Sequence, residues 1–165
     1  MLRRLLVLGL VCTLLASQSV LADGYTWNKV RYNGGTVSTK VDPKDWNNKL
    51  TISSDEIKFE LKDKQTVVID PKKVTGISYG QEAHRRVGTM IALGVLVTPL
   101  ALFGLLHKTK LHFIGVEYET ADGKKGGLLI QGHKDNYRAI LQALKSTTGK
   151  EVEMSTEDKK DEKKK

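Results

Sequence analysis

The segment VGTMIALGVLVTPLALFGLL, residues Val87–Leu106, contains no charged side chain and lies in the middle of the chain. A helix of about 20 residues at about 1.5 Å per residue is about 30 Å long, the thickness of the hydrocarbon core of a bilayer. Sequence typical of β-strands flanks the segment on both sides. The fold therefore depends on where this apolar segment lies.

Three placements are open. A single transmembrane helix would put the strands of residues 36–80 and those of 110–131 on opposite sides of a membrane. A helical hairpin that turns at Val97-Thr98-Pro99 would bring both ends out on one face, so that the two groups of strands could join. A helix buried in the core of the protein would need more surrounding chain than a small domain offers. We favour the hairpin, or another membrane-embedded arm, over the single span.

The N-terminus has the three parts of an export signal. Residues 1–22 begin with a positive pair, Arg3-Arg4, continue with the apolar run Leu5–Leu15, and end with the small residue Ala22 at an expected cleavage site. An uncleaved signal anchor is the alternative. The pattern predicts export, with the mature protein associated with a membrane on its extracytoplasmic side, in a periplasm or at the cell surface.

Charge and cysteine content restrict the chemistry. The 165 residues include 27 Lys and Arg against 19 Asp and Glu, a net charge of +8, part of which comes from the tail DKKDEKKK. Basic proteins bind anionic lipid or nucleic acid, but no basic patch is interleaved with aromatic residues, so we do not expect nucleic acid. Cys12 is the only cysteine and lies within the expected signal, so the mature chain would have no disulfide and no thiolate ligand.

Short alternating segments predict an antiparallel sheet followed by one helix. We expect residues 23–35 to be a linker that ends in the turn Asn33-Gly34-Gly35. Lys110–Glu119 is one expected strand, with Gly115 as a candidate bulge. Gly149 would stop the helix, and residues 149–165 would form a charged, disordered tail. The other expected strands and the helix are Thr36–Val41, Lys49–Ser53, Glu56–Leu61, Thr66–Asp70, Lys73–Gly80, Lys125–Gln131 and Tyr137–Thr148.

The order of these elements predicts an α+β fold, a small antiparallel split β-barrel with a C-terminal helix over residues 36–148. The segments KLTISSDEIKFEL and TVVIDPKKVTGISYG, together with the LHFIGVEY hairpin and its closing helix, resemble bacterial pleckstrin-homology-like or GRAM-like domains. The apolar insert 87–106 departs from that pattern. The resemblance implies a non-enzymatic module that binds lipid headgroups or peptides, and it transfers no specific ligand residue.

Four basic residues bracket the apolar segment: Arg85, Arg86, Lys108 and Lys110. Cationic side chains beside an embedded segment attract anionic headgroups, at about 1 kcal/mol each. We expect these residues to contact membrane lipid, although anchoring without any choice of lipid would use the same residues. The insert could also bind a protein partner or a second copy of the chain, because its glycines suit close helix packing.

Other candidate sites are weaker. The histidines His84, His107, His112 and His133 lack the spacing of a metal site, so we expect no metal and no cofactor. Gln81–His84 reads as a polar turn, and the glycine-rich run 123–127 as a hairpin turn rather than a phosphate cradle. No catalytic set is recognisable.

We therefore expect a non-enzymatic, exported, membrane-associated binding or scaffold module. Two alternatives remain. One is a single-pass membrane protein with its halves in opposite compartments. The other is a soluble secreted protein whose apolar arm binds a partner or lipid.

Overall fold

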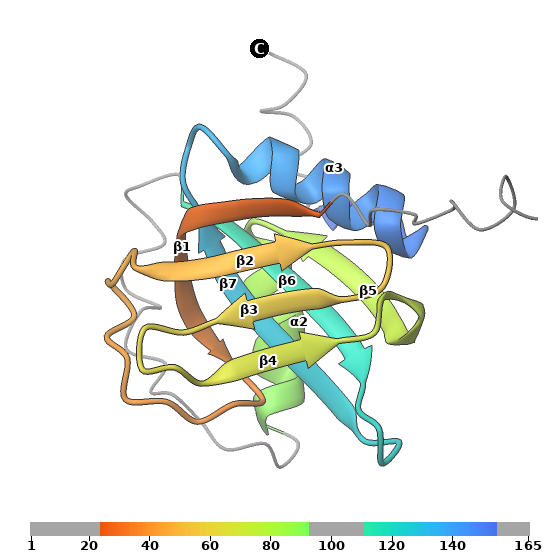
Figure 1. Ribbon diagram of the computed structural model, residues 1–165. Helices are drawn as coiled ribbons and strands as arrows, with labels where there is room; N and C mark the ends of the chain where they lie inside the picture. Colours follow the sequence, from red (N-terminus) through yellow and green to blue (C-terminus); the bar gives the residue numbers. More distant parts are fainter. Residues whose placement is uncertain (1–23, 93–110, 155–165) are drawn as a thin grey trace, which may run out of the picture.

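The computed structural model describes residues 24–92 and 111–154 (Figure 1). The expected signal peptide, residues 93–106 of the apolar insert with the hairpin turn expected there, and the end of the expected charged tail lie outside the described residues. Lys108 and Lys110 also lie outside them.

One eight-stranded sheet forms the body of the protein, in the order β4-β3-β2-β1-β7-β6-β5-β8. All neighbouring strands are antiparallel except β5 and β8. The strands that flank the apolar insert, β5 and β6, pair directly with each other. The strands are β1 Tyr25–Gly35, β2 Asn48–Ile52, β3 Ile57–Glu60, β4 Thr66–Ile69, β5 Val74–Tyr79, β6 His112–Glu119, β7 Lys125–Gly132 and β8 Val152–Met154.

The expected linker 23–35 is instead the central strand β1. Its first half pairs with β2 and its second half with β7, with a shift of register in each pairing. Val30 and Tyr32 are buried on its inner side. A Cβ on Gly35 would lie 2.3 Å from the carbonyl oxygen of Gly127, so the glycine allows close strand pairing here. The predicted turn at Asn33-Gly34-Gly35 was wrong, because glycine is favoured both in turns and where two strands approach closely.

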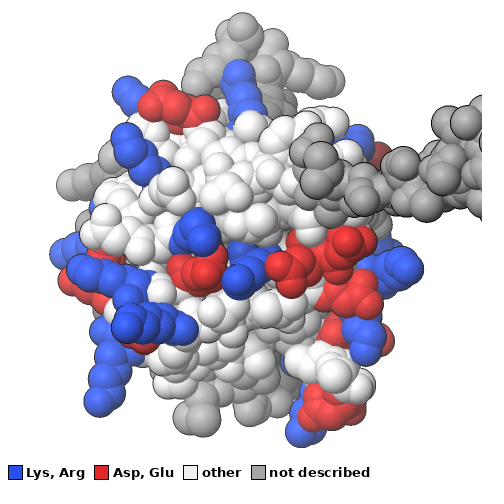
Figure 2. Space-filling view, in the orientation of Figure 1, with Lys and Arg blue, Asp and Glu red and all other residues white. Residues whose placement is uncertain are grey.

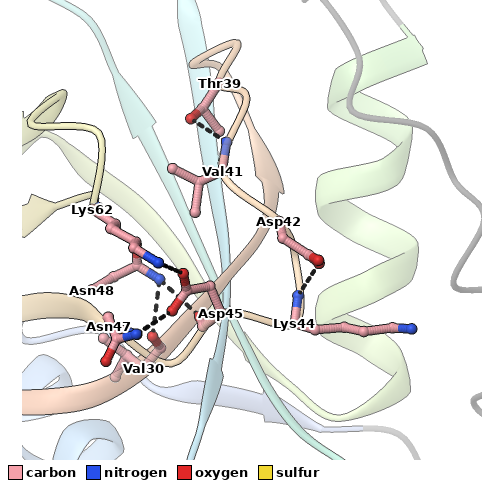
Figure 3. A network of polar contacts seen from close by, with 9 residues as sticks. All are labelled: Val30, Thr39, Val41, Asp42, Lys44, Asp45, Asn47, Asn48 and Lys62. Carbon is pink, nitrogen blue, oxygen red and sulfur yellow. Dashed lines mark hydrogen bonds and ion pairs between the residues drawn. The ribbon is translucent and has the colours of Figure 1, made fainter.

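The strand predicted at Thr36–Val41 does not form; these residues begin an irregular loop. Polar contacts position this loop beside the sheet (Figure 3). Buried Asn48 donates from Nδ2 to the carbonyl oxygens of Val30 (3.1 Å) and Asp45 (3.0 Å). The Asp45 carboxylate accepts a hydrogen bond from Lys62 Nζ at 2.6 Å. Within residues 36–41, Thr36 Oγ1 donates to the Gly127 carbonyl oxygen at 3.1 Å and Thr39 Oγ1 donates to Asp63 Oδ2 at 2.6 Å, so these β-branched residues bond through their side chains instead of pairing as a strand.

The inner face of the sheet and helix α3 (Tyr137–Thr148) enclose the main core. Ile140, Leu141 and Leu144 provide the buried stripe of α3, and Gly149 ends the helix in the left-handed conformation at φ 69°. The helix and its stop are therefore confirmed. A short 3₁₀ helix, η1 (Pro71–Lys73), follows β4, with Asp70 as its N-cap.

The expected disordered tail begins with a strand. In β8, Val152 and Met154 are partly buried against the main core, and the strand runs parallel to β5 from Ile77↔Val152 to Tyr79↔Met154. The many charged residues around β8 made this part of the sequence look disordered. The strand nevertheless forms, because two alternating apolar side chains are enough to cover the edge of β5. Residues 155–165 lie outside the described chain.

Helix α2 (Gln81–Ala92) follows β5 and includes the start of the apolar segment. It lies behind the sheet in Figure 1, while α3 covers an end of the curved sheet. Within the two described stretches, no helix is both long enough and apolar enough to cross a bilayer.

Candidate functional site

Helix α2 is attached to the outer face of the sheet by a second, small core. Ala83 and Val87 of α2 are fully buried against Phe113 of β6 and Leu129 of β7. Val87 is the first residue of the uncharged segment, so that segment starts inside the folded domain. We refer to this region as the arm base, which consists of Ala83, Arg86, Val87, Phe113, Gly115, Glu117, Leu129 and Glu153.

Gly115 makes room for α2. A Cβ at this position would lie 3.0 Å from Val87 Cγ2 and 2.6 Å from Ser78 Oγ. The pairing of β6 with β7 runs through Gly115 without a shift of register, so the predicted bulge is wrong. The glycine is needed because a helix packs closely on the strand, which a sequence pattern within the strand does not show.

Arg86 joins three elements in the arm base. Its guanidinium bonds both carboxylate oxygens of Glu117 on β6, with 3.0 Å between Nη2 and Oε2, and Nη1 bonds Glu153 on β8. The Glu117 side chain is only 7% exposed. The hydrogen bond to Glu117 is the main cause of a pKa of Arg86 above its ordinary value. A buried carboxylate is therefore compensated by a cation from α2.

Arg85, the neighbour of Arg86, has different surroundings. Its side chain is 73% exposed, and Nε lies 3.1 Å from Glu82 Oε2 in a pair along the helix. The bond to Glu82 raises the pKa of Arg85. Of the four predicted headgroup contacts, Arg85 thus lies at the surface and Arg86 is engaged in the arm base. Lys108 and Lys110 are outside the described residues.

The two described histidine side chains, His112 and His133, have different partners. His112 Nδ1 is 2.7 Å from the Tyr79 hydroxyl, and its ring stacks on Tyr137 with 3.7 Å between ring centroids. His133 pairs with Asp135 at 3.0 Å. The side chains of His84 and His107 are not among those described. In residues 24–92 and 111–154, no group of three or more potential metal ligands occurs.

The other two candidate motifs have structural roles. Residues 81–84 form the first turn of α2, so the predicted polar turn is wrong. Glu82 bonds Arg85, and that bond lowers the pKa of Glu82. Gly123 has a positive φ of 77° in the hairpin turn, as expected for turn chemistry, while Gly126 and Gly127 belong to β7.

Sequence reasoning missed Glu117 and Glu153. One signal for Glu117 was present: a carboxylate within the apolar strand HFIGVEYE needs a cation when both faces of the strand are covered. Nothing local pointed to Arg86 as the partner, because 31 positions separate the two residues.

The net positive charge is not concentrated on the face shown in Figure 2, where basic and acidic side chains alternate. Lys49 pairs with Glu60 at 2.5 Å, and Lys62 with Asp45 at 2.6 Å. Such pairs place charges of opposite sign side by side among the described residues.

No protein-family model matches the chain, and no curated protein matches it in sequence. Among solved structures, the chain is similar to one in the structure of the Spt16D–Pob3N heterodimer, with 10% sequence identity and a TM-score of 0.46. The similarity covers 81% of this chain and 55% of that one, so it spans about half of the solved chain.

Proposed function

We propose that this protein is a non-enzymatic, exported binding or scaffold domain that the apolar segment 87–106 holds to a membrane. The domain is a PH-like split barrel closed by α3. The observation that carries the proposal is that an uncharged segment starts in a helix fastened to the outer face of the sheet. An exposed segment of this composition is costly in water and stable in a bilayer.

The pairing of the flanking strands supports one topology. Since β5 and β6 pair from Val74↔Tyr118 to Tyr79↔Ile114, the segment between them leaves one folded domain and returns to it. A single span with the strand groups in opposite compartments would separate these two strands. A membrane-embedded arm with both ends on one side is compatible with the pairing.

Arg85 is the described residue best suited to contact anionic headgroups, because it is exposed on the helix that leads into the segment. Lys108 and Lys110, at the other end of the segment, complete the set. Arg86 belongs to the arm base and holds the helix in place.

Flotation with vesicles tests the membrane attachment. The chain is produced from Asp23 onward, which keeps every described residue and removes the expected signal. We expect it to float with phosphatidylcholine vesicles, and more strongly when phosphatidylglycerol is added. The double substitution Leu96→Asp and Leu102→Asp should abolish flotation. Val68→Asp is the matched control, because Val68 is an exposed apolar residue of β4; flotation that survives the double substitution contradicts the proposal.

Thiol labelling tests the topology. Single cysteines replace Ser54 or Ser146, both exposed, in a Cys12→Ser background, and cells or spheroplasts receive a membrane-impermeant maleimide. We expect both positions to be labelled. Labelling of only one would favour a single span, whereas labelling of both together with failure to float would favour a soluble secreted protein.

A further inference from the structure

The C-terminal strand β8 contacts the helix that leads into the apolar segment. Glu153 lies in the middle of β8 and bonds Arg86 on α2. Its side chain is 54% exposed, whereas the other partner of Arg86, Glu117, is almost fully buried. The arm base is therefore held by one carboxylate that belongs to the body of the sheet and by one that depends on β8.

The strand β8 is held by a short pairing with β5, by partly buried Val152 and Met154, and by the bond between Glu153 and Arg86. It is three residues long, at the edge of the sheet, and parallel to β5, and parallel pairing is slightly weaker per residue than antiparallel pairing. A cavity of about 350 Å³ lies between β8 and α3, with Leu141, Val152 and Met154 in its lining. Because α3 does not pack closely over β8, separating β8 from β5 should cost less free energy than separating an internal strand.

Helix α2 has two described kinds of attachment in its first half. The apolar one is small, with only Ala83 and Val87 from the helix in the buried cluster. The ionic one is Arg86, which bonds Glu117 and Glu153. Loss of β8 would remove one of the two carboxylates and a neighbouring strand, whereas the pairings of β5 with β6 and of β6 with β7 do not involve β8.

We propose that β8 is a clasp that controls how firmly α2 is held on the sheet. When β8 pairs with β5, Glu153 holds Arg86 and α2 stays docked. When β8 leaves, α2 separates from the sheet more often while the sheet remains folded. The further consequence, that the clasp regulates how far the apolar arm extends toward a membrane, rests on the function proposed above.

Hydrogen exchange measured by mass spectrometry tests the clasp on the full chain in detergent micelles. In Glu153→Gln, we expect amides of residues 81–92 to exchange about two- to five-fold faster, since pairs with an exposed partner contribute modestly. A chain ending at Lys150 should show about ten-fold faster exchange or more. Glu151→Gln is the matched control, because Glu151 pairs with Lys145 of α3 at 2.7 Å and should not affect α2.

Exchange in β6 and β7 separates clasp release from unfolding. The clasp predicts unchanged protection of residues 112–132 in both Glu153→Gln and the truncated chain. Unchanged exchange of α2 in both variants overturns the proposal, as does acceleration of α2 only together with β6 and β7. If α2 responds as expected but the chain does not float with vesicles, the clasp stands and the membrane function fails. If the chain floats and α2 does not respond, the clasp alone fails.

Discussion

The Arg86 guanidinium on α2 binds both carboxylate oxygens of Glu117, a residue of β6 whose side chain is 7% exposed. This pair joins the helix that leads into the apolar segment to the centre of the sheet. Because removal of one partner would leave a buried charge uncompensated, the two residues are strongly interdependent.

Substitution Arg86→Met should lower the free energy of unfolding by about 3–5 kcal/mol, because Glu117 would keep its burial and lose its cation. Urea denaturation followed by circular dichroism measures the change. Arg85→Met is the control and should cost much less, since the Arg85 side chain is 73% exposed and its pair with Glu82 lies within one helix turn. Adding Glu117→Gln to Arg86→Met should recover part of the loss, and a lack of recovery would show that the cost has another origin.

Two glycines of the arm base region should respond in opposite directions. Gly115→Ala should destabilise the protein by about 1–3 kcal/mol, because its Cβ would press on Val87 and Ser78. Gly88→Ala should stabilise it by about 0.5–1 kcal/mol, since Gly88 is helical and, outside the backbone of its own helix, no atom of the described residues lies within 4 Å of an added Cβ. Thermal unfolding of both variants checks the pair, and equal effects would argue against the docked position of α2.

Ser78 is fully buried in β5, and its hydroxyl has no hydrogen-bond partner among the described residues. Ser78→Ala removes that unsatisfied group and should stabilise the protein by about 1 kcal/mol. Ser53→Ala is the contrasting variant, because the Ser53 hydroxyl accepts a hydrogen bond from the Glu56 amide at 3.1 Å, and it should be destabilising. Loss of stability in Ser78→Ala would reveal a partner for this hydroxyl.

Stability should decline in acid through surface carboxylates. Bonds to Lys124 and then Thr120 lower the pKa of Asp122 from 3.8 to about 2, and a bond to Lys62 is the main cause of a lowered pKa of Asp45. A lowered folded-state pKa contributes stability above the ordinary pKa, and this contribution is lost as pH falls through the folded value. For Asp122 the loss should fall between pH 3.8 and about 2. Urea midpoints from pH 7 to pH 2 should decline less steeply in this range for Asp122→Asn.

The Arg31 guanidinium lies 4.0 Å from the centroid of the Trp46 ring, which attaches the loop before β2 to β1. Arg31→Met should cost about 0.5–1 kcal/mol and change the fluorescence of Trp46 in a Trp27→Phe background. Lys29→Met, on the same strand and exposed, should leave that fluorescence unchanged. An identical spectrum in both variants would show that the stacking does not hold the loop.

The sequence by itself determined the elements whose burial follows a local period. Alternation in Lys49–Ser53 and Glu56–Leu61 predicted β2 and β3, and helical spacing followed by Gly149 predicted α3 and its end. These signals work because one face of each element is buried, so the pattern of apolar residues records that face. The local periodicity of apolar residues was therefore enough to predict a fold of antiparallel strands with a C-terminal helix.

Only the tertiary structure decided β1, β8 and the arm base. Asn33-Gly34-Gly35 reads as a turn, yet Gly35 lies in a strand because β7 approaches it closely. Arg86 reads like Arg85 in the sequence, but its orientation toward Glu117 and Glu153 makes it an internal partner. Such roles depend on contacts between residues far apart in the chain, and local periodicity does not record which distant side chain will compensate a buried charge.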